Sequence, residues 1–163
     1  MGTDPVKPVV IAFDGSDASR VALEQAADLF PGRPAIIATV WEPGLAQVAI
    51  YDTWGSMGMP PDPRTVAEVD RAQREHARSV SGAGAELAKS LGLAAEPQAV
   101  EDEVDVGDTL LAIAEKADAG AIVVGSHGVT GLRSHLVGSV ARKLLAHCRR
   151  PVVVVRHREA EPE

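Results

Sequence analysis

The chain has 163 residues, of which 45% are hydrophobic and 24% are charged, and its net charge at pH 7 is −7. This length suits one domain with its own hydrophobic core, and the acidic balance argues against a nucleic-acid-binding protein, which needs a dominant basic face. No apolar run approaches the roughly 20 residues of a membrane-spanning helix, so we expect neither nucleic acid nor membrane as a partner.

The sequence predicts strands and helices that alternate along the chain. Short continuous runs of apolar, β-branched residues are typical of strands that are covered on both faces. The five predicted strands, in chain order, are Pro8–Phe13, Ala35–Trp41, Ala94–Glu101, Ala121–Gly125 and Pro151–Arg156. The third is the weakest, because it is less apolar and contains Pro97, so we expect it at or near a sheet edge.

Segments with apolar residues at helical spacing separate these strands. The four predicted helices are Asp17–Phe30, Arg64–Leu91, Val106–Lys116 and Ser139–His147. The first has Ser16 as its expected N-cap. The segment Glu42–Pro61 has no clear periodicity. It is either a lid or partner contact, or a disordered insertion.

Strict alternation of strands and helices predicts parallel strands joined by right-handed crossovers. The expected architecture is therefore an α/β fold, in which residues 1–158 form a single domain with an open five-stranded, mostly parallel sheet and helices on both faces. Residues 159–163 are expected to form an acidic tail. The one cysteine, Cys148, cannot form an internal disulfide, and the N-terminus has no signal-peptide pattern. We therefore expect a cytoplasmic location.

The most informative feature is a glycine pattern in a stretch that has no acidic residue. Ala119–Arg158 carries seven basic residues and no acidic one. It contains Gly125-Ser126-His127-Gly128 after the fourth predicted strand and, after a nine-residue gap, Gly138-Ser139-Val140 at the start of the last predicted helix. Backbone N–H groups of a glycine-rich turn and of a helix N-terminus can face an anion. The pattern therefore predicts a phosphate-bearing ligand.

The order of the strands decides where such a ligand binds. Ligands of open α/β sheets bind beyond the carboxyl ends of the strands, where the strand order reverses. If the first and fourth strands are neighbours there, the Asp14-Gly15-Ser16 turn, Val40-Trp41 and the glycine loop meet at one crevice. The common nucleotide signatures G-x-G-x-x-G and G-x-x-x-x-G-K-[ST] do not occur in the sequence.

Two blocks of the sequence resemble the universal stress protein family. GSHGVTGLRSHLVGSVARKLLAHCRRPVVVVR resembles its C-terminal signature, and VVIAFDGSDASRVALEQA resembles its first strand, turn and helix. The order of elements resembles the family over nearly the whole chain, which implies a Rossmann-like fold of the adenine-nucleotide alpha-hydrolase type. The spacing G-x2-G-x9-G-[ST], which marks the ATP-binding members of that family, is intact here.

The resemblance implies a site for ATP, with or without magnesium, at the positions that match the family's motifs. Gly125, Gly128, Gly138 and Ser139 match the loop that holds phosphate and ribose. The other matching positions are Ala12, Phe13 and Asp14 at the end of the first strand, Val40 against adenine, Val124 before the loop, and Val140 at the helix start. Asp14 either faces the ribose or a metal, or merely caps its turn. His127 either touches phosphate or is an exposed loop histidine.

Three functions follow from these expectations. The resemblance implies a nucleotide-dependent binding and regulatory module of the stress response, which acts on a protein partner that the sequence does not identify. A slow ATPase or nucleotidyl-transfer enzyme needs a positioned base and metal-binding carboxylates, and beyond Asp14 none is evident, so we predict no enzyme and no catalytic residue. A structural dimer without nucleotide is the third, and the intact glycine motif argues against it. The resemblance also implies that the apolar strand Val152–Val155 lies at a sheet edge and joins two protomers there. Because an apolar edge strand invites pairing, we predict a homodimer.

Two groups of charged residues are expected to lie in solvent. Arg142 and Lys143, on the last predicted helix, are expected to face away from the protein. The second group is acidic. Its spacing does not match a calcium-binding loop, so we predict a solvated turn. Its residues are Glu101, Asp102, Glu103, Asp105 and Asp108.

Overall fold

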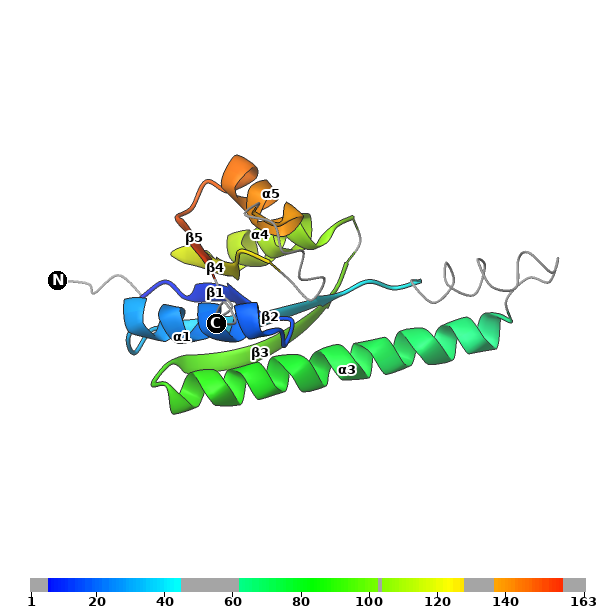
Figure 1. Ribbon diagram of the computed structural model, residues 1–163. Helices are drawn as coiled ribbons and strands as arrows, with labels where there is room; N and C mark the ends of the chain where they lie inside the picture. The colour runs from blue at the N-terminus through cyan, green and yellow to red at the C-terminus, as the bar shows by residue number, and fades with distance from the viewer. Residues whose placement is uncertain (1–5, 45–61, 103, 128–136, 157–163) are drawn as a thin grey trace, which may run out of the picture.

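Residues 6–44, 62–102, 104–127 and 137–156 are described by the computed structural model, in which an open sheet is covered by helices on both faces (Figure 1). The elements in chain order are β1 (Val9–Ala12), α1 (Asp17–Leu29), β2 (Pro34–Trp41), α3 (Pro63–Ser90), β3 (Ala94–Glu101), α4 (Val106–Lys116), β4 (Ala121–Gly125), α5 (Ser139–His147) and β5 (Val152–Val155). Gly128, residues 45–61 of the predicted Glu42–Pro61 loop and the tail 159–163 lie outside the described residues.

The five strands lie in the order β3-β2-β1-β4-β5, and every pairing between neighbours is parallel. The predicted α/β fold is confirmed, and Ala94–Glu101 is an edge strand as expected. From β1 the chain builds the sheet outward through β2 to β3, and then returns to place β4 on the other side of β1. The strand order therefore reverses between β1 and β4, which is the place where open α/β sheets bind ligands.

The central strands are apolar on both faces because both faces are covered. Val9, Val10 and Ile11 of β1 have no exposed surface, and β4 is buried along its whole length. On one face α1 and α3 pack against the sheet, and on the other α4 and α5 do so (Figure 1). None of the helices in the described part of the chain is long and apolar enough to cross a membrane.

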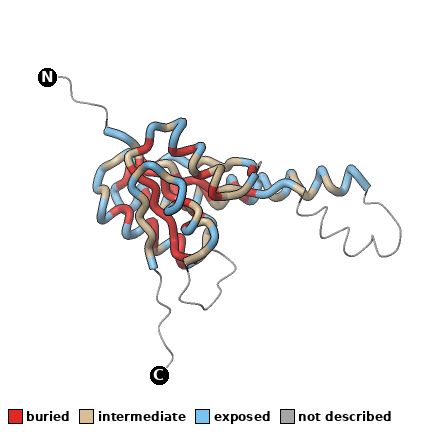
Figure 2. The backbone as a smooth tube through the Cα atoms, turned by 90° about the horizontal axis from the view of Figure 1, so that it is seen from above, coloured by how far each residue is buried: buried red, intermediate tan, exposed pale blue. Residues whose placement is uncertain are grey.

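The helix α3 meets the sheet at a glycine. A Cβ atom on Gly84 would lie 2.7 Å from Cδ1 of Phe13 and 2.8 Å from Cγ2 of Ile37. Glycine lowers the helical propensity of this segment, but here it leaves room for the Phe13 ring between helix and sheet. The buried residues of α3 begin only at Ala77, and the helix before it is exposed or half-buried and extends away from the body of the protein (Figure 2).

The helix starts differ in how their free N–H groups are satisfied. Ser16 caps α1 by accepting a hydrogen bond from the Ser19 N–H (3.2 Å), as the sequence predicts. Asp105 caps α4 by accepting from the Asp108 N–H (2.9 Å). The start of α5 has Gly138 at the N-cap and no side-chain cap hydrogen bond.

Candidate functional site

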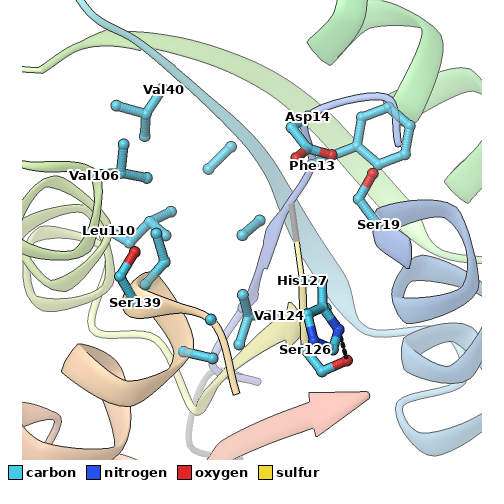
Figure 3. Close-up of a pocket in the computed structure, with 16 residues that line it drawn as sticks. Phe13, Asp14, Ser19, Val40, Val106, Leu110, Val124, Ser126, His127 and Ser139 are labelled. Atoms are coloured by element: carbon cyan, nitrogen blue, oxygen red, sulfur yellow. Dashed lines mark hydrogen bonds between the residues drawn. The ribbon is translucent and has the colours of Figure 1, made fainter. Parts of the chain in front are cut away.

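A pocket of about 260 Å³ opens where β1, β2 and β4 end, at the reversal of strand order (Figure 3). The residues that line it are Ala12, Phe13, Asp14, Ser19, Ala38, Val40, Val106, Leu110, Val124, Gly125, Ser126, His127, Gly138, Ser139, Val140 and Ala141. Its volume is close to the smallest of typical small-molecule pockets, which begin at about 300 Å³. The structure thus brings together every predicted site residue except Gly128, which lies outside the described residues.

Six lining residues were not singled out from the sequence: Ser19, Ala38, Val106, Leu110, Ser126 and Ala141. The spacing of Val106 and Leu110 places both on one face of a helix. No local pattern, however, indicates that this face reaches the pocket as well as the sheet. Their role depends on α4 lying beside α5, which is a property of the assembled sheet.

One wall of the pocket is apolar. Val40 of β2 and Val106 and Leu110 of α4 lie together on one side in Figure 3, and Val124 lies at the end of β4. Leu110 and Val124 are buried, and Val40 and Val106 are half-buried. A flat apolar group can therefore bind against this wall without leaving a polar atom unpaired.

Two glycines of the pocket lie in close contact with neighbouring backbone. A Cβ atom on Gly138 would lie 3.0 Å from the carbonyl oxygen of Ser126, and one on Gly125 would lie 3.1 Å from that of Ala18. The N–H of Gly138 donates to the Ser126 carbonyl (2.7 Å), and the N–H of Ser126 donates to the Val155 carbonyl (2.8 Å). These contacts hold the start of α5 against the loop that follows β4, so a larger side chain at either glycine would move the pocket wall.

Phe13 and Asp14 contribute to the pocket in different ways. The Phe13 ring packs against Gly84 of α3, and its carbonyl accepts a hydrogen bond from the Thr39 hydroxyl (2.7 Å). The exposed carboxylate of Asp14 accepts hydrogen bonds from the N–H (2.9 Å) and the hydroxyl (2.5 Å) of Ser16. Asp14 therefore caps its turn and also lines the pocket, so the two roles predicted as alternatives are compatible.

His127 lies at the pocket beside a buried serine. Its Nδ1 is 2.9 Å from Oγ of Ser126. Ser126 is only 2% exposed. Asp14 and His127 are the ionisable residues among those that line the pocket in the described chain. No group of three His, Cys, Asp or Glu residues in the described ranges is arranged to hold a metal ion.

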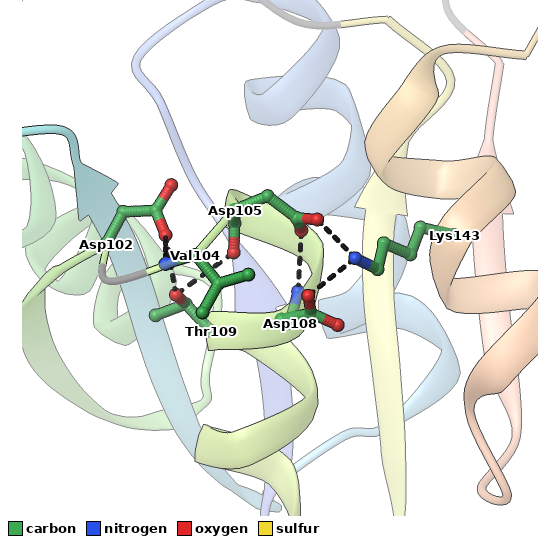
Figure 4. Close-up of polar contacts among 6 residues, drawn as sticks. All are labelled: Asp102, Val104, Asp105, Asp108, Thr109 and Lys143. Carbon is green, nitrogen blue, oxygen red and sulfur yellow. Dashed lines mark hydrogen bonds and ion pairs between the residues drawn. The ribbon is translucent and has the colours of Figure 1, made fainter.

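One ion-pair cluster links α4 to α5 next to the pocket wall (Figure 4). Lys143 of α5 contacts carboxylate oxygens of both Asp105 and Asp108, the latter at 2.6 Å. The Lys143 side chain is only 28% exposed. The prediction that Lys143 faces solvent is therefore wrong, because α4 brings two carboxylates to it. Arg142 is exposed as predicted.

These contacts shift the pKa values of two groups in the cluster. The hydrogen bond from Lys143, followed by that from the Asp108 N–H, lowers the pKa of Asp105 below its ordinary value of 3.8. The hydrogen bonds to Asp105 and then to Asp108 raise the pKa of Lys143 above 10.5. Both groups are therefore charged at neutral pH.

The strand order and the pocket at its reversal define a doubly wound α/β protein. The chain belongs to the universal stress protein family, whose family model matches residues 5–156. It is 27% identical over 162 residues to universal stress protein MJ0531 of Methanocaldococcus jannaschii, covering 98% of this chain and 88% of that protein.

Solved structures of other proteins share the fold. The hypothetical protein MJ0577 is 20% identical and superposes with a TM-score of 0.76, over 95% of this chain and 99% of that chain. The universal stress protein from Archaeoglobus fulgidus in complex with dAMP is 22% identical, with a TM-score of 0.58, over 91% of this chain and 96% of that chain.

Proposed function

We propose that this chain binds ATP in the pocket and acts as a nucleotide-dependent regulatory module of the stress response. In this proposal the adenine lies against the apolar wall formed by Val40, Val106 and Leu110, and the phosphates lie at the start of α5. The residues proposed to contact the nucleotide are Ala12, Phe13, Asp14, Val40, Val124, Gly125, His127, Gly128, Gly138, Ser139 and Val140.

The observation that carries the proposal is the start of α5 in the pocket. Gly138 is an N-cap without a side-chain hydrogen bond, and Ser139 and Val140 line the pocket. The first N–H groups of a helix have no partner within the helix, and with the helix dipole they favour an anion. A nucleotide joins a flat base to phosphates, which suits a pocket with an apolar wall and a helix start.

The family supports an adenine nucleotide in particular. The A. fulgidus relative is in complex with dAMP, and the spacing Gly125-x2-Gly128-x9-Gly138-Ser139 is intact in this chain. Among the described residues that line the pocket, Asp14 is the one with a carboxylate. We propose that it faces a magnesium ion if one accompanies the phosphates.

We also propose that the module is a cytoplasmic homodimer joined through β5. This strand forms one edge of the sheet, and its residues Val152–Val155 are half-buried. An edge strand with apolar side chains is a template for pairing with another chain. A protein partner of the dimer would then respond to the nucleotide that is bound.

The proposal is tested by calorimetric titration of the purified protein with ATP, ADP, AMP, cyclic AMP and adenosine. The variant Gly138→Val should bind ATP at least about tenfold more weakly, because its side chain meets the Ser126 carbonyl; tenfold corresponds to about 1.4 kcal/mol. The matched control is Gly82→Val in α3, where a Cβ atom meets nothing within 4 Å.

The same samples distinguish binding from catalysis. We expect no steady release of phosphate from ATP, and release that Asp14→Ala abolishes would instead establish a slow ATPase. If the folded native protein gives no heat with any of the nucleotides, the proposal is wrong and the structural alternative stands.

A further inference from the structure

The ion-pair cluster of Lys143 lies one helical turn from the proposed phosphate site. On α5, Lys143 follows Ser139 by four residues and Val140 by three, and those two residues line the pocket. Residues three and four apart share a face of a helix. On α4, Asp105 directly precedes Val106, which also lines the pocket. The cluster therefore joins the two helix starts that form this side of the pocket.

The lysine is held firmly between the helices. Asp105 uses one carboxylate oxygen to cap α4 through the Asp108 N–H and the other to bind Lys143 (Figure 4). The methylene chain of Lys143 crosses the buried Gly107, where a Cβ atom would lie 3.0 Å from its Cδ and 3.2 Å from its Cβ. A side chain at Gly107 would press on the lysine, which would have to shift by a few tenths of an ångström. The position of the Lys143 ammonium group is thus set by packing as well as by charge.

The cluster also determines the charge beside the pocket. Asp105 at the N-cap and Asp108 in the first turn place two negative charges at the start of α4. Lys143 supplies the positive charge that they contact. Among the described residues that line the pocket, no lysine or arginine is present to offset them. Without Lys143, these two partly exposed carboxylates would leave uncompensated negative charge next to the start of α5, where we propose that the phosphates lie. Salt would screen part of this charge.

We propose that Lys143 is a positioning residue for the phosphates of the nucleotide. It holds the start of α5 against α4 and offsets the charge of Asp105 and Asp108, so that the N–H groups of α5 attract phosphate. This inference rests on the proposed function. It assigns to Lys143 a role in affinity for phosphate, while the adenosine part of the ligand depends on the apolar wall.

The test compares ATP with adenosine by calorimetry, at low and at high salt, for Lys143→Met, Lys143→Arg and Asp108→Asn. We expect Lys143→Met to weaken ATP binding about fivefold at low salt and less at high salt, with adenosine changed less than about twofold. Lys143→Arg should restore ATP binding to within about threefold, since it keeps the charge. Asp108→Asn should leave ATP binding unchanged or strengthen it up to about twofold, because it removes a negative charge.

Two controls separate this role from a structural one. Arg142→Met removes a positive charge from the neighbouring exposed position of α5 and should change ATP affinity less than about twofold. Circular dichroism checks that each variant is folded; should Lys143→Met not fold, Lys143→Arg and Asp108→Asn still provide the comparison.

The outcomes are separable. If the native protein binds no nucleotide, the proposed function fails. If it binds ATP but Lys143→Met and Arg142→Met have equal effects, or if Asp108→Asn weakens ATP as Lys143→Met does, the charge role of Lys143 is refuted and the cluster is only a brace. Equal losses for ATP and adenosine in Lys143→Met refute it as well.

Discussion

Replacing Gly84 by alanine tests how tightly α3 is seated on the sheet beside the pocket. A Cβ atom at this position would lie 2.7 Å from Cδ1 and 2.9 Å from Cε1 of Phe13, and 2.8 Å from Cγ2 of Ile37. Separations this short force the ring or the helix to move. Phe13 is 4% exposed and Ile37 is fully buried, so neither side chain has open space to enter.

Two opposing terms determine the size of the effect. Alanine gains about 0.5–1 kcal/mol over glycine inside a helix, whereas overpacking a close-packed core costs about 1–3 kcal/mol. Gly82 lies on the same helix, but a Cβ atom there meets nothing within 4 Å. The change in unfolding free energy of Gly82→Ala therefore reports the gain in helix propensity alone. That of Gly84→Ala reports the same gain minus the cost of overpacking. We expect Gly84→Ala to be less stable than Gly82→Ala by about 1–3 kcal/mol.

The assay is urea-induced unfolding followed by far-ultraviolet circular dichroism, with both variants and the native protein at one protein concentration. With a urea dependence of about 2 kcal/mol per molar, the midpoints of the two variants should differ by about 0.5–1.5 M. Equal midpoints would refute the reasoning, because they would mean that the contact between α3 and Phe13 relaxes at no cost.

Two further predictions concern pH and assembly. The pKa of Asp105 is lowered in the folded protein, chiefly by Lys143, so its contribution to stability is present above its unfolded pKa of about 3.8 and is lost as pH falls through the lower folded value. The loss of unfolding free energy between pH 7 and pH 3 should therefore be smaller in Lys143→Met than in the native protein, and an unchanged loss would contradict the assigned cause. For assembly, light scattering at micromolar concentration should give twice the mass of the chain, as pairing through Val152–Val155 requires; a monomeric mass would exclude the proposed dimer.

Much of the fold could be predicted because its determinants are local. The three inner strands β1, β2 and β4 are short continuous apolar runs, since both of their faces are covered. Ser16 indicated the start of α1 because a capping hydrogen bond spans only three residues. Pro97 indicated an edge strand because proline has no N–H to donate to a neighbouring strand. Each of these signals is contained within a few residues of sequence.

The candidate site could be predicted in part for the same reason. The motif residues Gly125, Gly138 and Ser139 follow a strand or begin a helix, so their place at the carboxyl end of a parallel sheet follows from the order of elements. Val106 and Leu110 were missed, because their helix reaches the pocket only through its packing beside α5. Lys143 was expected in solvent, because its partners Asp105 and Asp108 lie 38 and 35 residues earlier in the chain.

The alternation of strands and helices and the glycine spacing at the ligand-binding edge can be predicted from the amino-acid sequence, since both depend on residues close together in the chain. Which residues meet at that edge depends on how the elements pack. The reversal of strand order places β4 beside β1 and α4 beside α5, which forms the apolar wall and brings two carboxylates to Lys143. On the other face of the sheet, the packing of α3 places Gly84 against Phe13. Such contacts join residues far apart in the chain, and they exist only once the sheet has brought their elements together.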